Sequence, residues 1–253
     1  MTHDVHQRLV PFEACFNFRD LGGYSTIDGR RIRQGVLYRA DSLHRLTDAD
    51  VRAFHELGLR AVIDLRSAAE IDDFGRFRWA VDERPTWHHV PMIDEVLLRV
   101  GAGSPPPAST QSPADAYGNI VAGGTSVARV FGLLATADQL PAVFHCTSGK
   151  DRTGIIAAMV LDLLGVPDSV IAVDYAITNE TRRRSTAWIE ENEPAFAAFL
   201  ALIPEARRHV DPQHILGFLD QLRDRHGSIE GFLVGVGVHP DALADLRTRL
   251  LTD

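Results

Sequence analysis

The segment from Pro141 to Leu161 constrains the fold of this chain more than any other. Residues 141–144 (PAVF) are apolar and β-prone, residues 145–154 (HCTSGKDRTG) are mostly polar, and residues 155–161 (IIAAMVL) are apolar again. This order predicts a buried strand, a tight loop and the start of a buried helix. Successive loop amides and a helix N-terminus together form a cradle for an anion. The segment therefore predicts an α/β fold with an anion-binding loop between a strand and a helix.

Three side chains of this loop fit chemistry on a bound phosphoryl group. Cys146 begins the loop, and the field that attracts an anion also favours a thiolate at this position. Arg152 follows six positions later, and its planar guanidinium can hold two phosphoryl oxygens. Thr153 can donate a hydrogen bond to the sulfur. The chemistry implied is in-line transfer of a phosphoryl group to sulfur, followed by hydrolysis.

Two glycines fit the same loop, and one alternative loop type is excluded. Gly149 permits tight curvature, and Gly154 permits close approach of the helix. A nucleotide-binding loop needs Ser or Thr after its lysine and a glycine near its start. This chain has Asp151 after Lys150, and Phe144 stands where that first glycine is required.

Composition limits the partners and the compartment. Acidic residues outnumber basic ones 34 to 26, and the formal net charge of −8 disfavours nucleic acid and anionic membranes as partners. No apolar run approaches the about 20 residues of a membrane helix, and the N-terminus lacks the pattern of a signal peptide. The cysteines, Cys15 and Cys146, suit a reducing compartment. We therefore expect a soluble, cytoplasmic chain without an integral membrane segment.

The remaining pattern predicts one domain over residues 1–253. Asp28 and Gly29 predict a hairpin turn, and a helix capped by Thr47 and closed by Gly58 leads into a buried strand at 61–65. Further strands are expected at 36–38 and 87–92, and a helix at 126–134. Residues 101–116 (GAGSPPPASTQSPADA) predict a flexible loop or lid. We reject an interdomain linker there because the best motif involves segments on both sides of it.

The loop HCTSGKDRTG resembles the active-site loop of cysteine-dependent protein tyrosine phosphatases, His-Cys-x5-Arg-Ser/Thr-Gly. Its GKDRTG version resembles the bacterial tyrosine/serine phosphatase family, with members acting on phosphoproteins and phosphoinositides. The resemblance extends to residues 17–23 (NFRDLGG), 37–41 (LYRAD), 64–67 (DLRS), 174–180 (DYAITNE) and 231–233 (GFL). It implies a mixed, mainly parallel sheet flanked by helices, with extra C-terminal helices. It also implies a phosphorylated protein or phosphoinositide substrate, with inorganic phosphate as product.

The resemblance implies roles for the loop residues. Cys146 is the nucleophile that forms a phosphocysteine, and Arg152 binds phosphate together with Thr147, Ser148, Gly149, Lys150, Thr153 and Gly154. Asp151 is the implied general acid/base, although a purely structural role in the loop is an equal alternative. Asp64 is the second candidate, and its alternative is a structural role as a helix N-cap or as the partner of Arg66. Lys150 either holds a second phosphate or is solvated.

Other candidates are weaker. Asp115 lies 31 residues before Cys146, but a solvated loop carboxylate is favoured. Cys15 can form a protective disulfide with Cys146, but a plain buried thiol is favoured. Salt bridges that order the loop are considered for Arg19, Arg39 and Arg66, and a surface or strand-end arginine is an equal alternative for each. No cluster has metal-ligand spacing, so neither a metal nor another cofactor is predicted.

Three rivals remain besides a tyrosine phosphatase. A phosphoinositide phosphatase is favoured if Lys150 recognises a second phosphate. A sulfur transferase also uses a cysteine at a strand–helix loop, but the sequence from Arg152 to Gly154 argues against it. A phosphoprotein-binding module is expected to lack the cysteine or the arginine, and this chain has both.

Overall fold

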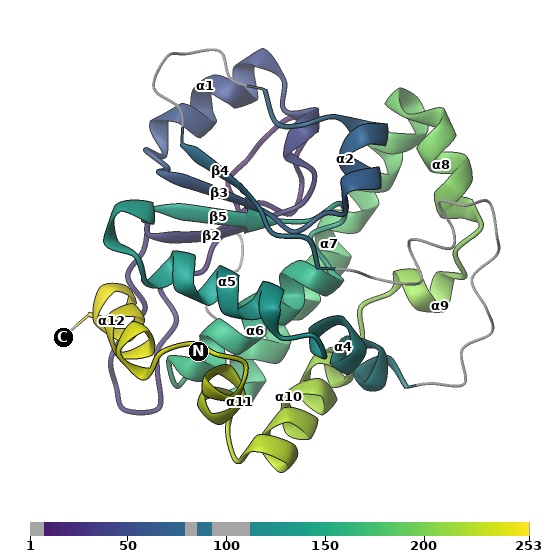
Figure 1. The fold of residues 1–253 in the computed structure, drawn as a ribbon. Coiled ribbons are helices and arrows are strands. Elements are labelled where there is room, and N and C mark those ends of the chain that lie inside the picture. The colour runs from purple at the N-terminus through teal and green to yellow at the C-terminus, as the bar shows by residue number, and fades with distance from the viewer. Residues whose placement is uncertain (1–7, 79–84, 93–111, 253) are drawn as a thin grey trace.

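The centre of the fold is a mixed sheet, drawn in Figure 1 from a computed structural model that describes residues 8–78, 85–92 and 112–252. Its five strands in this part of the chain are β1 (Arg19–Asp20), β2 (Leu37–Ala40), β3 (Ala61–Asp64), β4 (Thr86–His89) and β5 (Ala142–His145). Their order is β1-β2-β5-β3-β4. The last four run parallel, and β1 pairs with β2 in the antiparallel sense. The predicted mixed, mainly parallel sheet is therefore confirmed.

Helices cover both faces of this sheet. Those in the described part of the chain are α1 (Asp48–Glu56), α2 (Ala68–Phe74), α4 (Pro113–Val121), α5 (Thr125–Ala135), α6 (Asp151–Leu163), α7 (Asp168–Asn192), α8 (Pro194–Ala201), α9 (Glu205–Arg208), α10 (Pro212–His226), α11 (Ile229–Gly235) and α12 (Pro240–Leu250). Helix α1 lies on one side of the sheet, and α5, α6, α11 and α12 lie on the other (Figure 1). The predicted C-terminal set of helices is thus present.

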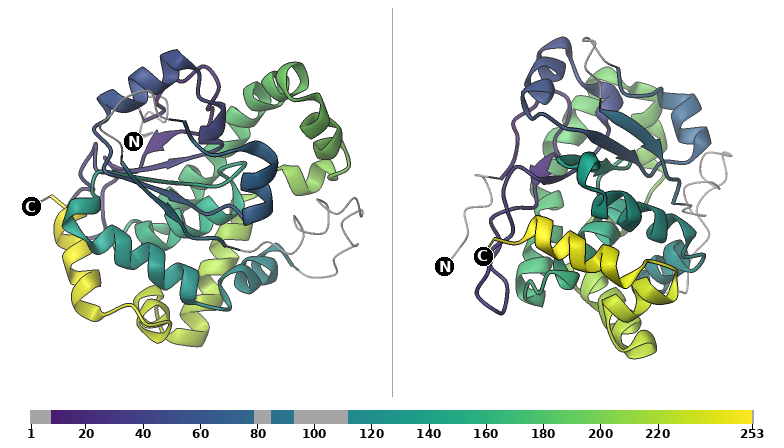
Figure 2. Two further views of the ribbon diagram at one scale, coloured as in Figure 1. Left: turned by 45° about the horizontal axis from the view of Figure 1, so that its top comes forward. Right: turned by 60° about the vertical axis from the view of Figure 1, so that its left-hand side comes forward.

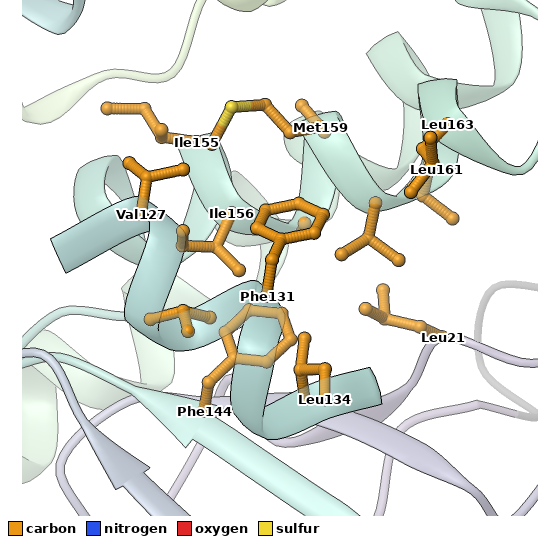
Figure 3. Packing of buried hydrophobic residues seen from close by; sticks show 14 of the residues in the cluster. Leu21, Val127, Phe131, Leu134, Phe144, Ile155, Ile156, Met159, Leu161 and Leu163 are labelled. Carbon is orange, nitrogen blue, oxygen red and sulfur yellow. The ribbon is translucent and has the colours of Figure 1, made fainter. Parts of the chain in front are cut away.

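The central strands are apolar on both faces because both faces are covered. In β5, Val143 packs in one cluster with Phe54 of α1, while its neighbour Phe144 packs in the cluster on the opposite face. Figure 3 shows Phe144 together with Phe131 of α5 and Ile156 of α6. Side chains alternate along a strand, so an unbroken apolar run is what a strand with two buried faces requires.

The register of the sheet brings three strand ends together. Ala40 of β2 and Asp64 of β3 both pair with His145 of β5. The segments that follow these residues therefore leave the sheet side by side, at the carboxyl edge where open α/β sheets place ligands. The loop that begins at Cys146 is the central one.

The predicted helix cap, the glycine after that helix and the hairpin turn are all present in the structure. Thr47 caps α1 in a capping box with Asp50, and Gly58 adopts a positive φ of 61° after the helix. The Asp28–Gly29 turn closes a hairpin in which Ser25 pairs with Arg31. Figure 2 shows this hairpin beside the C-terminal end of the chain, where Ile32 pairs with Leu251.

The predicted flexible loop at 101–116 is only partly described. Residues 101–111 lie outside the described residues. The final part is helical instead, because the hydroxyl of Ser112 accepts a hydrogen bond from the amide of Asp115, and Pro113 occupies the first turn of α4. The loop prediction is therefore wrong for residues 113–116.

Within the described residues, no single helix is long and apolar enough to cross a membrane. Helices α4 and α5 reach that length and hydrophobicity only as a pair, which is bent by 72° between them. The apolar side chains of α5, including Val127, Val130 and Phe131, are buried in the protein core.

Candidate active site

The loop after Cys146 is held from outside through its carbonyl oxygens. The hydroxyl of Ser42 donates to the carbonyl of Thr147 at 2.7 Å. The side-chain amide of Asn17 donates to the carbonyls of Ser148 and Gly149 at 3.4 and 3.1 Å. Three successive carbonyl groups thus point outward, toward residues from the N-terminal quarter of the chain.

The outward carbonyls fix the direction of the next amides. In a trans peptide the C=O of one residue and the N–H of the next point in opposite directions. The N–H groups of Ser148, Gly149 and Lys150 therefore point toward the interior of the loop. No described residue accepts a hydrogen bond from the amides of Ser148 and Gly149. Convergent amides next to a helix N-terminus are the geometry that an anion cradle requires.

Gly149 is required at its position in the loop. Its φ is +61°, and a Cβ atom there would lie 2.8 Å from the carbonyl oxygen of Ala40. Gly154 is required for a different reason, since a Cβ atom would lie 2.7 Å from the ring of Tyr175. Both glycines thus have the predicted roles, curvature for Gly149 and close approach for Gly154.

A buried network of ion pairs contacts the loop through the carbonyl of Gly149. Arg39 donates to the carbonyl of Gly149 and to the carboxylate of Asp174, both at 2.7 Å. Arg19 also pairs with Asp174, at 3.0 Å, and Tyr24 donates to the same carboxylate. Burial opposes ionisation of Asp174, but the two arginines outweigh it and hold its pKa below the usual range. The salt bridges considered for Arg19 and Arg39 are therefore present.

Cys146 lies buried directly after β5, with 2% of its surface exposed. The hydroxyl of Thr153, in the first turn of α6, donates a hydrogen bond to its sulfur at 3.1 Å. This is the contact predicted from the sequence, and it stabilises negative charge on the sulfur. The imidazole of His145 lies 3.4 Å from the carbonyl of Cys146, through Nδ1.

Arg152 is held by a carboxylate that the sequence analysis missed. Its two terminal nitrogens donate to Glu70 of α2, at 2.6 and 2.7 Å. Glu70 also accepts from the hydroxyl of Thr147 and from the amide of Ser67. Burial opposes ionisation, but the bonds from Arg152 outweigh it and lower the pKa of Glu70 to about 2. A charged Glu70 thus ties the arginine to the first residue after the cysteine.

Asp151 is the first residue of α6, and its side chain is 28% exposed. Its Oδ1 accepts a hydrogen bond from the hydroxyl of Tyr117 at 2.5 Å. The ammonium group of Lys150 lies 3.5 Å from the same oxygen. Asp151 and Lys150 therefore remain next to each other at the loop, and the carboxylate is accessible.

Asp64 is placed differently from the expectation of a proton donor. Its side chain is completely buried, and both oxygens accept from Arg66, at 2.9 and 2.7 Å. His145 lies 3.6 Å away. Burial raises the pKa of Asp64, but His145 and Arg66 more than offset this and hold it below the usual range. The structure supports the alternative reading, in which Asp64 is the partner of Arg66 at the end of β3.

Two further candidates have other partners. The carboxylate of Asp115 accepts hydrogen bonds from the hydroxyl of Ser112, the N-cap of its own helix, and from the side-chain amide of Gln221. Cys15 is a free, buried thiol that donates to Asp41 at 2.8 Å, and burial raises its pKa. Neither residue contributes to the described site as it stands. In the described part of the chain, no group of three or more acidic, histidine or cysteine side chains can hold a metal ion.

The supporting residues that escaped the sequence analysis as functional candidates include Asn17, Ser42, Glu70, Tyr117 and Asp174. Asn17 and Asp174 lie in segments 17–23 and 174–180, which resemble the family but were assigned no role. For Glu70 the local signal is the capping box that it forms with Ser67 in α2. The others contact partners far away in the sequence: Asn17 is 131 residues from Ser148, Tyr117 is 34 residues from Asp151, and Asp174 is 135 residues from Arg39. No local pattern predicts such contacts.

The family follows from a comparison with known proteins. The sequence profile described as the tyrosine phosphatase family matches residues 10–252. The chain belongs to the tyrosine phosphatase family. The predicted family and the predicted class of enzyme, a phosphatase, are thereby confirmed. The match covers the loop, the supporting network and the C-terminal helices alike.

Three bacterial relatives are similar in sequence to this chain. A provisionally named tyrosine-protein phosphatase of Cupriavidus necator is 35% identical over 68% of this chain, and the match spans 63% of that relative. A tyrosine-protein phosphatase of Nostoc commune is 30% identical, over 84% of this chain and 73% of the relative. The triple specificity protein phosphatase PtpB of Mycobacterium tuberculosis is 27% identical, over 94% and 97%.

Proposed function

We propose that this protein hydrolyses phosphomonoesters through Cys146, and that phosphotyrosine in proteins is its main substrate. One observation carries the proposal. A cysteine whose sulfur accepts a hydrogen bond from Thr153 begins a loop whose amides converge and whose arginine is fixed by Glu70. Such an arrangement stabilises a thiolate and binds a phosphoryl group in one place.

Cys146 acts first in the proposed reaction. Its thiolate attacks phosphorus while the bond to the leaving oxygen breaks. Asp151 donates a proton to that oxygen, and a phosphocysteine remains. The loop amides of Ser148, Gly149 and Lys150 and the guanidinium of Arg152 hold the phosphoryl oxygens, with Thr147, Thr153 and Gly154 shaping the loop.

Water completes the proposed cycle. It attacks phosphorus, Asp151 takes the proton that it loses, and the sulfur–phosphorus bond breaks. Inorganic phosphate leaves, and the hydrogen bond from Thr153 stabilises the thiolate that reappears on Cys146. Asp64 takes no proton-transfer role in this scheme, because it is buried against Arg66.

A phosphoinositide is the second candidate substrate. Lys150 supports it, because this lysine lies at the N-terminus of α6 beside the accessible Asp151, where a second phosphate could meet its ammonium group. The name of the relative PtpB, a triple specificity phosphatase, supports a broad substrate range. Two free cysteines fit a reducing compartment, so we propose the cytoplasm as its location.

Phosphate release from a defined panel tests this function. The panel holds phosphotyrosine and phosphoserine peptides and inositol lipids with one or two phosphates, assayed with EDTA present. Cys146→Ser is the blank, and we expect it to bind phosphate without turnover. Preference for phosphotyrosine peptides supports the main proposal, and preference for bis-phosphorylated lipids supports the alternative. Turnover by Cys146→Ser would overturn the mechanism.

Asp151→Asn tests the proton donor. Loss of an acid costs more when the leaving group is a poor one. We therefore expect a larger loss with phosphoserine peptides than with p-nitrophenyl phosphate. Equal losses on both substrates would remove Asp151 from this role.

A further inference from the structure

Two buried tyrosines lie behind the carboxylate of Asp151. Tyr117 comes from α4 and Tyr175 from α7, and their hydroxyl groups form a short hydrogen bond with each other. Tyr117 then donates to Oδ1 of Asp151 at 2.5 Å. The tyrosines are almost completely buried, whereas the carboxylate is partly exposed. Asp151 is therefore anchored on its protein side and open on the other.

The two carboxylate oxygens of Asp151 are not equivalent. Oδ1 receives the hydroxyl of Tyr117 and has the ammonium group of Lys150 at 3.5 Å. No described residue donates a hydrogen bond to Oδ2. A carboxylate held through one oxygen loses freedom about its side-chain torsion, and the other oxygen keeps a fixed direction.

We propose that Tyr117 is a positioning residue for Asp151, holding Oδ1 so that Oδ2 is the oxygen that exchanges protons with substrate and water. This inference rests on the proposed function, because it requires Asp151 to transfer protons. Tyr117 itself acts through Asp151. Tyr175 in turn orients Tyr117. Its hydroxyl contacts that of Tyr117, and its ring packs against Gly154 in the first turn of α6.

Tyr117 is well suited to remain a hydrogen-bond donor. Burial, followed by the charge of Asp151, holds the pKa of Tyr117 far above its usual range. Burial also raises the pKa of Tyr175. Both shifts favour the neutral phenol, which is the form that donates a hydrogen bond.

A hydrogen bond given to a carboxylate stabilises its ionised form. The titratable and charged groups that face Asp151 among the described residues are Lys150 on its own loop, Tyr117 on α4 and Tyr175 on α7. Tyr117 contacts the carboxylate directly, so a change at Tyr117 can be followed in the pH dependence of the reaction.

Tyr117→Phe tests this role through the pH dependence of kcat/KM. With a phosphoserine peptide, the first chemical step needs a protonated acid, so the alkaline limb reports that acid in the free enzyme. We expect the limb to move upward, because the carboxylate loses the hydrogen bond that the phenol donates to it. Looser positioning should also lower kcat about 3- to 30-fold.

Tyr38→Phe is the matched control. Tyr38 is another buried tyrosine, but it lies on β2 and its hydroxyl does not contact Asp151. We expect its alkaline limb to coincide with that of the unchanged enzyme. A shift of the same size in Tyr38→Phe would mean that any buried hydroxyl deletion perturbs the site, and it would overturn the inference.

A double mutant separates the inference from the proposed function. In the Asp151→Asn background, Tyr117→Phe should cause no further change in leaving-group dependence or pH profile. A full additional effect there would mean that Tyr117 acts independently of Asp151. If Asp151→Asn alone leaves the leaving-group dependence unchanged, the proton-transfer role of Asp151 fails. If it changes that dependence while Tyr117→Phe leaves the limb in place, only the positioning role fails.

A second variant covers the case in which Tyr117→Phe does not fold. Placing 3-fluorotyrosine at position 117 keeps the hydroxyl and makes it a stronger donor. The alkaline limb should then move downward, opposite to the effect of removing the hydroxyl. An unchanged or upward-moving limb in a folded protein would contradict the proposal.

Discussion

The hydroxyl oxygen of Thr153 lies 3.1 Å from the sulfur of Cys146 and donates a hydrogen bond to it. The two residues are seven positions apart, at opposite ends of the loop, and both are buried. Thr153, in the first turn of α6, thus provides a neutral hydrogen-bond donor to the sulfur of Cys146. This hydrogen bond should accelerate most the step in which the sulfur regains its negative charge.

Replacing Thr153 by valine tests this effect at nearly constant shape. A hydrogen bond to a charged group contributes about 1.5–3 kcal/mol, so we expect hydrolysis of the phosphocysteine to slow about 10- to 100-fold. Thr153→Ser keeps the hydroxyl and is the control. Rapid-mixing assays with p-nitrophenyl phosphate should show a larger burst and a slower steady state in Thr153→Val. Equal rates in the valine and serine variants would contradict this role.

Glu70 should orient Arg152 for phosphate. Glu70→Gln keeps the shape but loses the charge that holds both terminal nitrogens of the guanidinium. Because one partner of a largely buried ion pair is removed, we expect kcat/KM to fall about 10- to 100-fold and inhibition by phosphate to weaken. The control is Glu56→Gln, an exposed glutamate at the end of α1. Tighter phosphate binding in Glu70→Gln would instead show that Glu70 competes with the substrate.

Asp174 should dominate the stability of the support beneath the loop. Asp174→Asn leaves Arg19 and Arg39 buried without their counter-charge, and such a change typically costs about 3–5 kcal/mol. Asp245→Asn is the control, since Asp245 forms only an exposed pair with Arg249, at 3.8 Å. Urea denaturation of the three proteins at pH 7 measures the difference. Similar unfolding free energies for both variants would rule out this network as a main source of stability.

His145 should make the protein sensitive to mild acid. Burial, only partly offset by Asp64, lowers the pKa of His145 from 6.5 to about 4. A folded-state pKa below the unfolded value means that the unfolded chain binds the proton first. The stability of the neutral, folded state is therefore complete above pH 6.5 and declines as the pH falls from 6.5 to about 4. Over this pH range the free energy of unfolding should fall by about 3 kcal/mol.

Unfolding free energies of the unchanged protein and His145→Asn, measured by urea at pH 7, 5.5 and 4.5, check this sign. The variant lacks the titrating group, so its profile should be flatter over that range. Parallel profiles would assign the acid sensitivity to other groups. Glu70, with a pKa lowered to about 2, contributes in the same direction only at lower pH, between about 4.5 and 2.

The loop and its immediate neighbours could be predicted because their roles depend on local order. Gly149, Gly154 and the bond from Thr153 to Cys146 all follow from a strand, a tight turn and a helix within 14 residues, from Pro141 to Gly154. Strands β3 and β5 were also predictable, because a strand covered on both faces requires an unbroken apolar run.

The helical start of α4 was missed for a local reason. Pro113 follows three earlier prolines and many small residues, so composition favours a loop there. The same residue also fits the first turn of a helix, and Ser112 caps it through the amide of Asp115. Once the apolar side chains Tyr117 and Val121 are buried, the helix is favoured, and only tertiary packing supplies that burial.

The sequence by itself determined that Cys146 and Arg152 lie on one tight loop between a strand and a helix, because a contiguous motif fixes its own local geometry. Only the tertiary structure distinguished the surroundings of Asp151 and Asp64, the two carboxylates between which the sequence left the proton donor open. Both are carboxylates beside an arginine in the sequence, but Asp64 is buried in a bidentate pair with Arg66, while Asp151 stays accessible beside Tyr117. Burial and the choice of partner depend on segments far apart in the chain, and these meet only when the sheet and helices pack.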